Sequence, residues 1–179
     1  MSSEITADEV DFVRIDKNLI NKAIDAVDAL RKRGLKAVTA ESCTGGLIAT
    51  VLSEAPGAAE HFEGAFVVYT TEQKYFALKV TPATIEKHGL VSAEVAVAMA
   101  EGALEGSRAD IAVAVTGVAG PEPDEQRNPV GLVYFGCARR GEPSFHRKRD
   151  FGDRGRSAVR YAAAEEALAI VRGCAAARD

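Results

Sequence analysis

The sequence predicts an α/β fold, a single-domain three-layer sandwich in which a mixed sheet carries helices on both faces. With 179 residues, of which 47% are hydrophobic and 27% charged, the chain has the size of one globular domain and can bury a core. Short apolar runs typical of strands alternate with segments of helical apolar spacing, and two further strand-like runs flank a turn. These features indicate a mixed sheet but leave the order of its strands open.

The first half of the chain begins with an amphipathic helix over residues 18–33, which the following glycine ends. A short apolar strand is predicted at 35–38, and apolar residues at helical spacing predict a helix over 47–52. The segment 66–74 then runs from a strand into another helix, for which Thr70 or Thr71 supplies the cap.

The second half begins with a long helix predicted over 92–105 and a strand that starts at residue 111. The runs 130–138 and 144–151 form a predicted hairpin around a polar turn. A closing helix is expected from about 156 to 172, so that the last strands and this helix complete the sandwich.

The domain is therefore expected to span residues 16–172, between a flexible lead-in at 1–15 and a frayed tail at 173–179. The polar, acidic lead-in has neither signal-peptide nor membrane-span character. The three cysteines lack disulfide or metal spacing, which favours a reducing, cytoplasmic location. A formal net charge of −4 argues against a general affinity for nucleic acid, and the basic run 146–149 is typical of a solvated edge strand.

A candidate nucleophile, Ser42, lies at the turn between the strand at 35–38 and the helix that follows. Amides in the first turn of a helix have no partner within the helix, and Gly45 and Gly46 allow a substrate oxygen to approach them. This arrangement predicts an oxyanion hole at the helix start. An ordinary helix capped by Ser42 or Thr44 explains the same residues without chemistry.

Two more strand-to-helix or strand-to-loop junctions carry reactive or polar side chains. Tyr69 and Lys74 flank the junction within 66–74, and Thr116 follows the strand that starts at residue 111. Because ligands of open α/β sheets bind beyond the carboxyl ends of the strands, we expect these three junctions to converge at one edge of the sheet.

Five ordered segments, namely 40–46, 67–69 followed by Lys74, 89–92, 115–121 and 129–133, together resemble the CinA C-terminal domain family. The resemblance spans about residues 18–170. It implies a nicotinamide-nucleotide amidohydrolase, an enzyme that hydrolyses the carboxamide of nicotinamide mononucleotide to nicotinic acid mononucleotide and ammonia. It also implies that the reaction needs no metal and no cofactor.

Carried over residue by residue, the resemblance implies that Ser42 is the nucleophile, that Lys74 is the general base, and that Tyr69 assists or orients this pair. Thr116 matches an active-site threonine, and Gly152-Asp153-Arg154 matches a segment that supplies a substrate arginine. This match identifies Arg154, with Arg156 and Arg160 as alternatives. The expected substrate-binding residues are then Thr44, Gly45, Gly46, Thr116, Gly117 and Arg154.

The chemistry of lysine sets a condition on this assignment. A free lysine has a pKa of about 10.4 and is protonated at neutral pH, so Lys74 can act as a base only if burial or a nearby cation lowers its pKa. We therefore expect Lys74 to lie in a partly desolvated pocket within reach of Ser42. Tyr69 at a strand end is equally explained by packing.

Two neighbours of Ser42 have alternative roles. Cys43 is intrinsically the better nucleophile as a thiolate, but His61, His88 and His146 all lie outside the strand-end motifs, so we expect Cys43 to be a small buried residue. Glu41 is expected to bind a substrate hydroxyl, to bind the Gly-Gly turn, or to cap the helix.

One loop departs from the family pattern. Where family members have a Gly-rich stretch, this chain has the acidic segment 122–128, in which Arg127 is a candidate to compensate for the added negative charge. Two other functions therefore stay open: a Ser-Lys amidase acting on a different carboxamide, and a catalytically silent nucleotide-binding module. Apolar surface at the sheet edge or on the Ala-rich last helix predicts a homo-oligomer.

Overall fold

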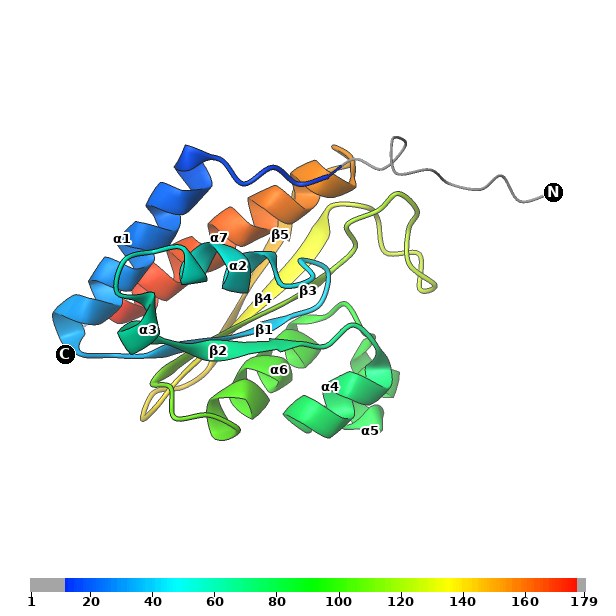
Figure 1. The fold of residues 1–179 in the computed structure, drawn as a ribbon. Coiled ribbons are helices and arrows are strands. Elements are labelled where there is room, and N and C mark those ends of the chain that lie inside the picture. Colours follow the sequence, from blue (N-terminus) through cyan, green and yellow to red (C-terminus); the bar gives the residue numbers. More distant parts are fainter. Residues whose placement is uncertain (1–11, 177–179) are drawn as a thin grey trace.

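The computed structural model describes residues 12–176, and its centre is a five-stranded mixed sheet of strand order β2–β1–β3–β4–β5 (Figure 1). Strands β1, β2 and β3 are parallel, whereas β4 and β5 form an antiparallel hairpin beside β3. The strands are β1 (Ala37–Glu41), β2 (Phe62–Val67), β3 (Ile111–Gly117), β4 (Leu132–Arg139) and β5 (Phe145–Asp150). The predicted mixed sheet is confirmed, and the structure supplies its order.

Helices cover both faces of this sheet, as the sequence predicts (Figure 1). One face carries α1 (Lys17–Arg33), α2 (Leu47–Ser53), α3 (Ala58–His61) and α7 (Arg156–Ala176); the other carries α4 (Thr71–Leu78), α5 (Pro82–His88) and α6 (Ala93–Glu105). Within residues 12–176, no helix is both long and apolar enough to cross a membrane.

The two faces of the sheet carry side chains of different size. Along β3, the large residues Ile111, Val113 and Val115 pack in the core with α1 and α7, whereas Ala112 and Ala114 pack in the core with α6. A Cβ atom added to Gly136 would lie 2.0 Å from the carbonyl oxygen of Ala96. The small residues therefore allow α6 to lie close against the sheet.

Local capping signals account for several helix ends. Asp16 accepts a hydrogen bond from the amide of Leu19 at the start of α1, and Gly34 ends that helix in the left-handed conformation with φ 64°. Thr70, one of the two predicted caps, accepts from the amide of Gln73 at the start of α4. This cap therefore starts α4 only a few residues after the end of β2.

Several element boundaries differ from the sequence-based prediction. Strand β1 begins two residues later than expected and extends to Glu41, because parallel pairing with β2 and β3 continues to that residue. Helix α7 extends to Ala176, so that residues 173–176 of the expected tail are helical, and Cys174 and Ala175 are buried in the core. Residues 1–11 of the lead-in and 177–179 of the tail lie outside the described residues.

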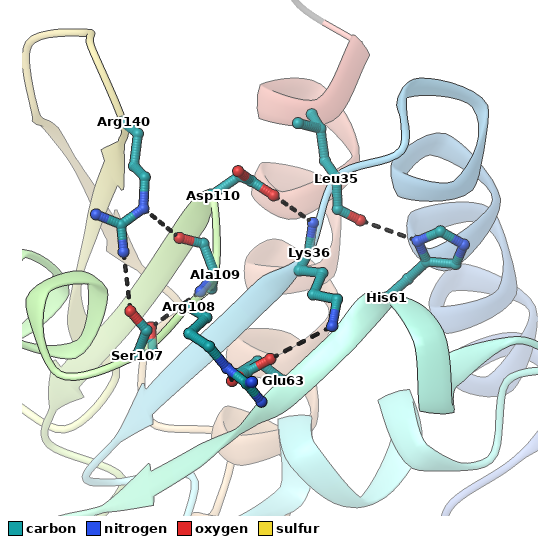
Figure 2. Close-up of polar contacts among 9 residues, drawn as sticks. All are labelled: Leu35, Lys36, His61, Glu63, Ser107, Arg108, Ala109, Asp110 and Arg140. Atoms are coloured by element: carbon teal, nitrogen blue, oxygen red, sulfur yellow. Dashed lines mark hydrogen bonds and ion pairs between the residues drawn. The ribbon is translucent and has the colours of Figure 1, made fainter.

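A polar network joins the amino-terminal ends of the parallel strands (Figure 2). The carboxylate of Asp110 accepts a 2.8 Å hydrogen bond from the amide of Lys36, and His61 Nδ1 lies 2.9 Å from the carbonyl oxygen of Leu35. Arg140 donates to the carbonyl oxygens of Ala109 and Leu104. The contact with Leu35 gives His61 a structural role at the amino-terminal end of the parallel strands, opposite the end where Ser42 lies.

Candidate active site

The three junctions predicted from the sequence converge at the carboxyl ends of β1, β2 and β3. The parallel register pairs Glu41 of β1 with Val67 of β2 and with Val115 of β3. Beyond this row, the amide of Ser42 donates to the carbonyl oxygen of Val115, and the amide of Val68 donates to that of Glu41. Ser42 is thus bound to β3 through its amide and directly follows the residue that is bound to the end of β2, at the carboxyl-terminal end of the parallel strands.

Lys74 comes from the first turn of α4 and reaches back to Ser42. Its Nζ lies 3.1 Å from Ser42 Oγ and donates to the carbonyl oxygen of Val68, also at 3.1 Å. The side chain is fully buried, and burial lowers the pKa of its amine below the ordinary value. Among the described residues, no carboxylate forms a salt bridge with Lys74. A neutral amine at this position can accept the proton of the Ser42 hydroxyl.

Glu41 caps helix α2 from a fully buried position. Its carboxylate accepts hydrogen bonds of 2.8 to 3.3 Å from the hydroxyls of Thr39 and Thr44 and from the amides of Gly46, Ile48 and Ala49. Of the alternatives for Glu41, the structure therefore supports binding of the Gly-Gly turn and capping of the helix.

This cap corrects the predicted position of the oxyanion hole. The amides of Gly46, Ile48 and Ala49 are occupied by Glu41, and the amide of Gly45 donates to the carbonyl oxygen of Ser42. The Gly-Gly turn and the first turn of α2 therefore have no spare amide donor at these four positions. The prediction failed because an acidic residue that ends the preceding strand reaches the same amides first.

Two other backbone amides directly follow Ser42, the expected nucleophile. Among the described residues, neither the amide of Cys43 nor that of Thr44 donates a hydrogen bond to another residue, whereas the amides of Ser42 and Gly45 do. An amide that directly follows a nucleophilic serine is a recurring oxyanion donor in hydrolases with a strand-to-helix turn. Cys43 and Thr44 are therefore the better candidates for this role.

Replacement of Glu41 by glutamine is expected to lower the free energy of unfolding by about 2–4 kcal/mol, because the new amide group faces donors that it cannot satisfy. Urea unfolding followed by circular dichroism measures this loss. Glu54→Gln removes the same charge from an exposed position next to the same helix and is the matched control. Equal stability of the Glu41 and Glu54 variants would show that the buried cap is dispensable.

Tyr69 is 61% exposed and contacts helix α7 rather than the Ser42–Lys74 pair. Its hydroxyl accepts a 3.1 Å hydrogen bond from Arg156 Nη2, while Arg156 Nη1 donates to the carbonyl oxygen of Gly120 at 2.8 Å. No hydrogen bond joins Tyr69 to either Ser42 or Lys74 among the described residues. Tyr69 and Arg156 instead form a polar bridge between the β2 and β3 junctions and the start of α7.

The three candidate arginines have different surroundings. Arg160 Nη2 donates to the carbonyl oxygen of Thr44 at 2.8 Å, and its buried Nε has no partner within residues 12–176. Arg154 is exposed and lines a surface cavity with Asp16 and Tyr161. The structure thus brings Arg156 and Arg160 to the junctions, while no described contact joins Arg154 to them. The sequence signal for Arg156 is its place as the first residue of the closing helix.

The remaining predicted site residues contact the loops that surround Ser42. Thr44 is buried with its hydroxyl bound to Glu41, and the hydroxyl of Thr116 donates to the carbonyl oxygen of Leu90 at 3.0 Å. Gly45, at φ 61°, leaves room for Arg160 Nη2, which would lie 3.4 Å from an added Cβ. A Cβ on Gly117 would lie 2.7 Å from the carbonyl oxygen of Leu132. These residues therefore position the loops around Ser42.

Cys43 is 7% exposed, and burial raises the pKa of its thiol to about 12. The thiol is therefore protonated at neutral pH, in agreement with the expected small buried residue. Within the described chain, no group of three or more His, Cys, Asp or Glu side chains is placed to hold a metal ion.

The acidic loop 122–128 folds around Asp124, whose carboxylate accepts from the amides of Gln126 and Asn128 and from the Asn128 side chain. Gln126 packs on the backbone of Gly89, where an added Cβ would lie 2.5 Å from Gln126 Oε1. The loop therefore packs on residues 89–90, the segment whose Leu90 carbonyl accepts the hydrogen bond from Thr116. Arg127 is exposed on this loop.

Comparison with known proteins gives a consistent set of relatives. A model of the CinA C-terminal domain matches residues 20–175. The nicotinamide-nucleotide amidohydrolase PncC of Escherichia coli K12 is 42% identical over 154 residues, which cover 86% of this chain and 92% of that protein.

Other relatives are longer than this chain. A putative competence-damage inducible protein of Caldicellulosiruptor saccharolyticus is 42% identical over 88% of this chain but only 38% of its own length. Among solved structures, the competence/damage inducible protein CihA of Agrobacterium tumefaciens matches with a TM-score of 0.85 and 38% identity, over 90% of this chain and 98% of that one.

Proposed function

The chain belongs to the CinA C-terminal domain family, and from this membership and the geometry of Ser42 and Lys74 we propose that it is a nicotinamide-nucleotide amidohydrolase. Its substrate is nicotinamide mononucleotide, and its products are nicotinic acid mononucleotide and ammonia. The observation that carries the proposal is the 3.1 Å contact between the buried Lys74 amine and the Ser42 hydroxyl. The nicotinamide-nucleotide amidohydrolase PncC of Escherichia coli K12, which is 42% identical over most of both chains, supports the choice of substrate.

The proposed reaction has two halves. In the first, the neutral amine of Lys74 takes the proton of Ser42 Oγ as this oxygen attacks the carboxamide carbon. The negative charge that develops on the carbonyl oxygen is stabilised by the amides of Cys43 and Thr44. The tetrahedral intermediate then expels ammonia, which receives the proton that Lys74 had taken, and an ester to Ser42 is left.

In the second half, Lys74 removes a proton from water as the water oxygen attacks the ester carbon. Collapse of the second tetrahedral intermediate breaks the bond to Ser42 Oγ and returns the proton to that oxygen through Lys74. The product is a carboxylate. The bond from Lys74 to the carbonyl oxygen of Val68 supports this role, because it fixes the amine in place during both halves.

The nucleotide part of the substrate is anionic at its phosphate and cationic at its pyridinium ring. Arg156 is the proposed phosphate partner because a guanidinium binds phosphate through two parallel hydrogen bonds and because Arg156 lies beside the junctions. Tyr69, largely exposed next to it, offers an aromatic face to the pyridinium cation. Thr44, Gly45, Gly46, Thr116 and Gly117 shape the surrounding loops.

Release of ammonia from nicotinamide mononucleotide by the purified protein tests the proposal directly. Nicotinamide and nicotinamide riboside are the matched substrates, because they keep the carboxamide and lack the phosphate. Preferential turnover of the nucleotide is expected. Turnover of an unrelated carboxamide in its place would favour the alternative Ser-Lys amidase, and saturable binding of the nucleotide without turnover would favour the silent binding module.

The arginine assignment is tested by one pair of variants. Arg156→Ala is expected to raise the KM for nicotinamide mononucleotide by about 10- to 100-fold, because a charge-assisted bidentate contact is lost. Arg154→Ala, two residues away and exposed, is expected to leave KM within about twofold of the parent. The reverse pattern, with KM raised only in the Arg154 variant, would return the substrate contact to the residue that the family motif indicates.

We also propose that the protein self-associates and acts in the cytoplasm. Four apolar side chains that are 45–66% exposed support the first point: Val67, Tyr69, Tyr75 and Phe76. They lie on the edge strand β2, directly after it and on α4. Three free cysteines support the second. Sedimentation velocity at two protein concentrations tests the self-association.

A further inference from the structure

Two cysteines that are 37 positions apart in the sequence meet inside the fold. Cys137 lies on β4 and Cys174 in the last turn of α7, and their Sγ atoms are 2.9 Å apart. Both side chains are buried, with 1% and 8% of their surface exposed. Both are free thiols, and a small movement would bring their sulfur atoms to the S–S bond length of about 2.05 Å that a disulfide has.

A small cavity connects this pair to its surroundings. The cavity has a volume of about 160 Å³, and both cysteines line it together with Arg139, Arg147 and Phe145. A space of this size admits a small oxidant, which a densely packed core does not. The thiols are therefore buried from bulk solvent and still within reach of a molecule that enters the cavity.

Two guanidinium groups lie beside the pair. Arg139 Nη1 donates to the carbonyl oxygen of Cys174 at 3.0 Å, and Arg147 faces the same cavity while it is paired with Glu166. The hydrogen bond from the Cys137 thiol, and then these two guanidinium groups, lower the pKa of Cys174, whereas the same hydrogen bond and burial raise that of Cys137. Because Arg139 contacts Cys174 directly, Cys174 is assigned as the attacking thiol and Cys137 as the resolving one.

We propose that Cys137 and Cys174 form a reversible modification site, which a peroxide oxidises to an intramolecular disulfide between β4 and α7. The Cys174 thiolate attacks one oxygen of hydrogen peroxide, so that the O–O bond breaks, hydroxide leaves and a sulfenic acid forms. The Cys137 sulfur then attacks the Cys174 sulfur, and the S–O bond breaks. Water leaves with the Cys137 proton, so that two thiols and one peroxide yield one disulfide and two waters.

The position of the pair in the fold determines the effect of this disulfide. Cys137 pairs with Val113 in the sheet, toward the end of β4 that is opposite Ser42, and Cys174 lies at the far end of the helix that begins with Arg156. The disulfide therefore leaves the Ser42–Lys74 pair untouched and anchors the C-terminal end of α7 to the sheet. Its closure of a long loop in the unfolded chain stabilises the fold.

Counting thiols in the parent protein tests the proposal. After treatment with hydrogen peroxide and denaturation, the number of reactive thiols is expected to fall from three to one, and dithiothreitol is expected to restore all three. Peptide mapping is expected to link Cys137 to Cys174, and the melting temperature of the oxidised protein is expected to rise by roughly 5–15 °C.

Two variants separate this site from Cys43. Cys43→Ala is expected to lose both of its thiols on oxidation, whereas Cys174→Ala is expected to keep both of its own; these results need no assay of the enzyme. The proposal is wrong if the parent keeps three thiols, if the crosslink joins two chains, or if Cys43 is the residue consumed. A disulfide that forms without raising the melting temperature would remove the stabilising role.

Discussion

Replacement of Ser42 by alanine is expected to lower kcat for ammonia release by about ten-thousand-fold or more, because it removes the oxygen that forms the proposed covalent intermediate. Ser42 Oγ contacts Lys74 Nζ, and its backbone amide bond to Val115 does not depend on the side chain. The variant is therefore expected to fold normally and to bind nicotinamide mononucleotide with nearly the parent affinity. Steady-state kinetics and calorimetric titration measure the two quantities separately.

The matched control for this prediction is Cys43→Ala, one residue along the chain. Cys43 is buried with its thiol protonated, so its removal is expected to change kcat by less than about tenfold. Full activity in the Ser42 variant together with lost activity in the Cys43 variant would transfer the nucleophile to the thiol and overturn the serine mechanism, while the reaction itself would stand.

Replacement of Lys74 by methionine is expected to lower kcat/KM by about a thousandfold or more, because this change keeps most of the side-chain volume but removes the one basic side chain that contacts Ser42 Oγ within residues 12–176. Lys87→Met, which changes an exposed lysine on α5, is the matched control and is expected to behave like the parent. Equal activity of the Lys74 and Lys87 variants would exclude Lys74 as the base.

The pH dependence of the parent enzyme follows from the same residue. Burial lowers the pKa of Lys74, and only the neutral amine can accept a proton, so kcat/KM is expected to rise as pH rises through that lowered pKa. In the Lys74→Met variant, the residual activity is expected to lose this rise. A rise of the same size in both proteins would assign it to another group.

The stability of the Lys74→Met variant has a predictable sign. Between the lowered pKa of the folded state and the ordinary lysine pKa, the unfolded chain binds more protons, so the parent gains stability as pH rises. Below the lowered pKa, the parent carries a buried charge that methionine lacks. The variant is therefore expected to melt above the parent by a margin that is largest at low pH and shrinks as pH rises.

The α/β class and most elements could be predicted because each depends on a local pattern. Apolar periodicity indicated the helices and strands, Gly34 ended α1, and Thr70 capped α4, all through contacts within a few residues. Boundaries were less accurate where pairing with a distant strand extends an element, as at the end of β1, or where packing extends one, as at the end of α7.

The candidate site divides in the same way. Ser42 and Lys74 could be proposed from the sequence because Ser42 directly follows a strand, Lys74 lies in the helix after another strand, and the surrounding segments resemble one family. The occupation of the helix amides by Glu41 could not, because it depends on where β1 stops relative to α2. The sequence also did not show which of Arg154, Arg156 and Arg160 lies beside the junctions, because the direction of each side chain depends on how the start of α7 packs against the sheet.

By itself, the sequence determined the fold class, the family and the junctions that carry the proposed nucleophile and its proposed base, because these depend on short segments whose side chains act locally. Only the tertiary structure decided the strand order, the contact between Cys137 and Cys174, and the occupation by Glu41 of the helix amides that the sequence suggested as an oxyanion hole. Each of these depends on packing between elements that are distant in the chain or on the orientation of one element against another. Spacing along a sequence does not carry that information, because the side chains of separate elements meet only once the sheet and helices have packed.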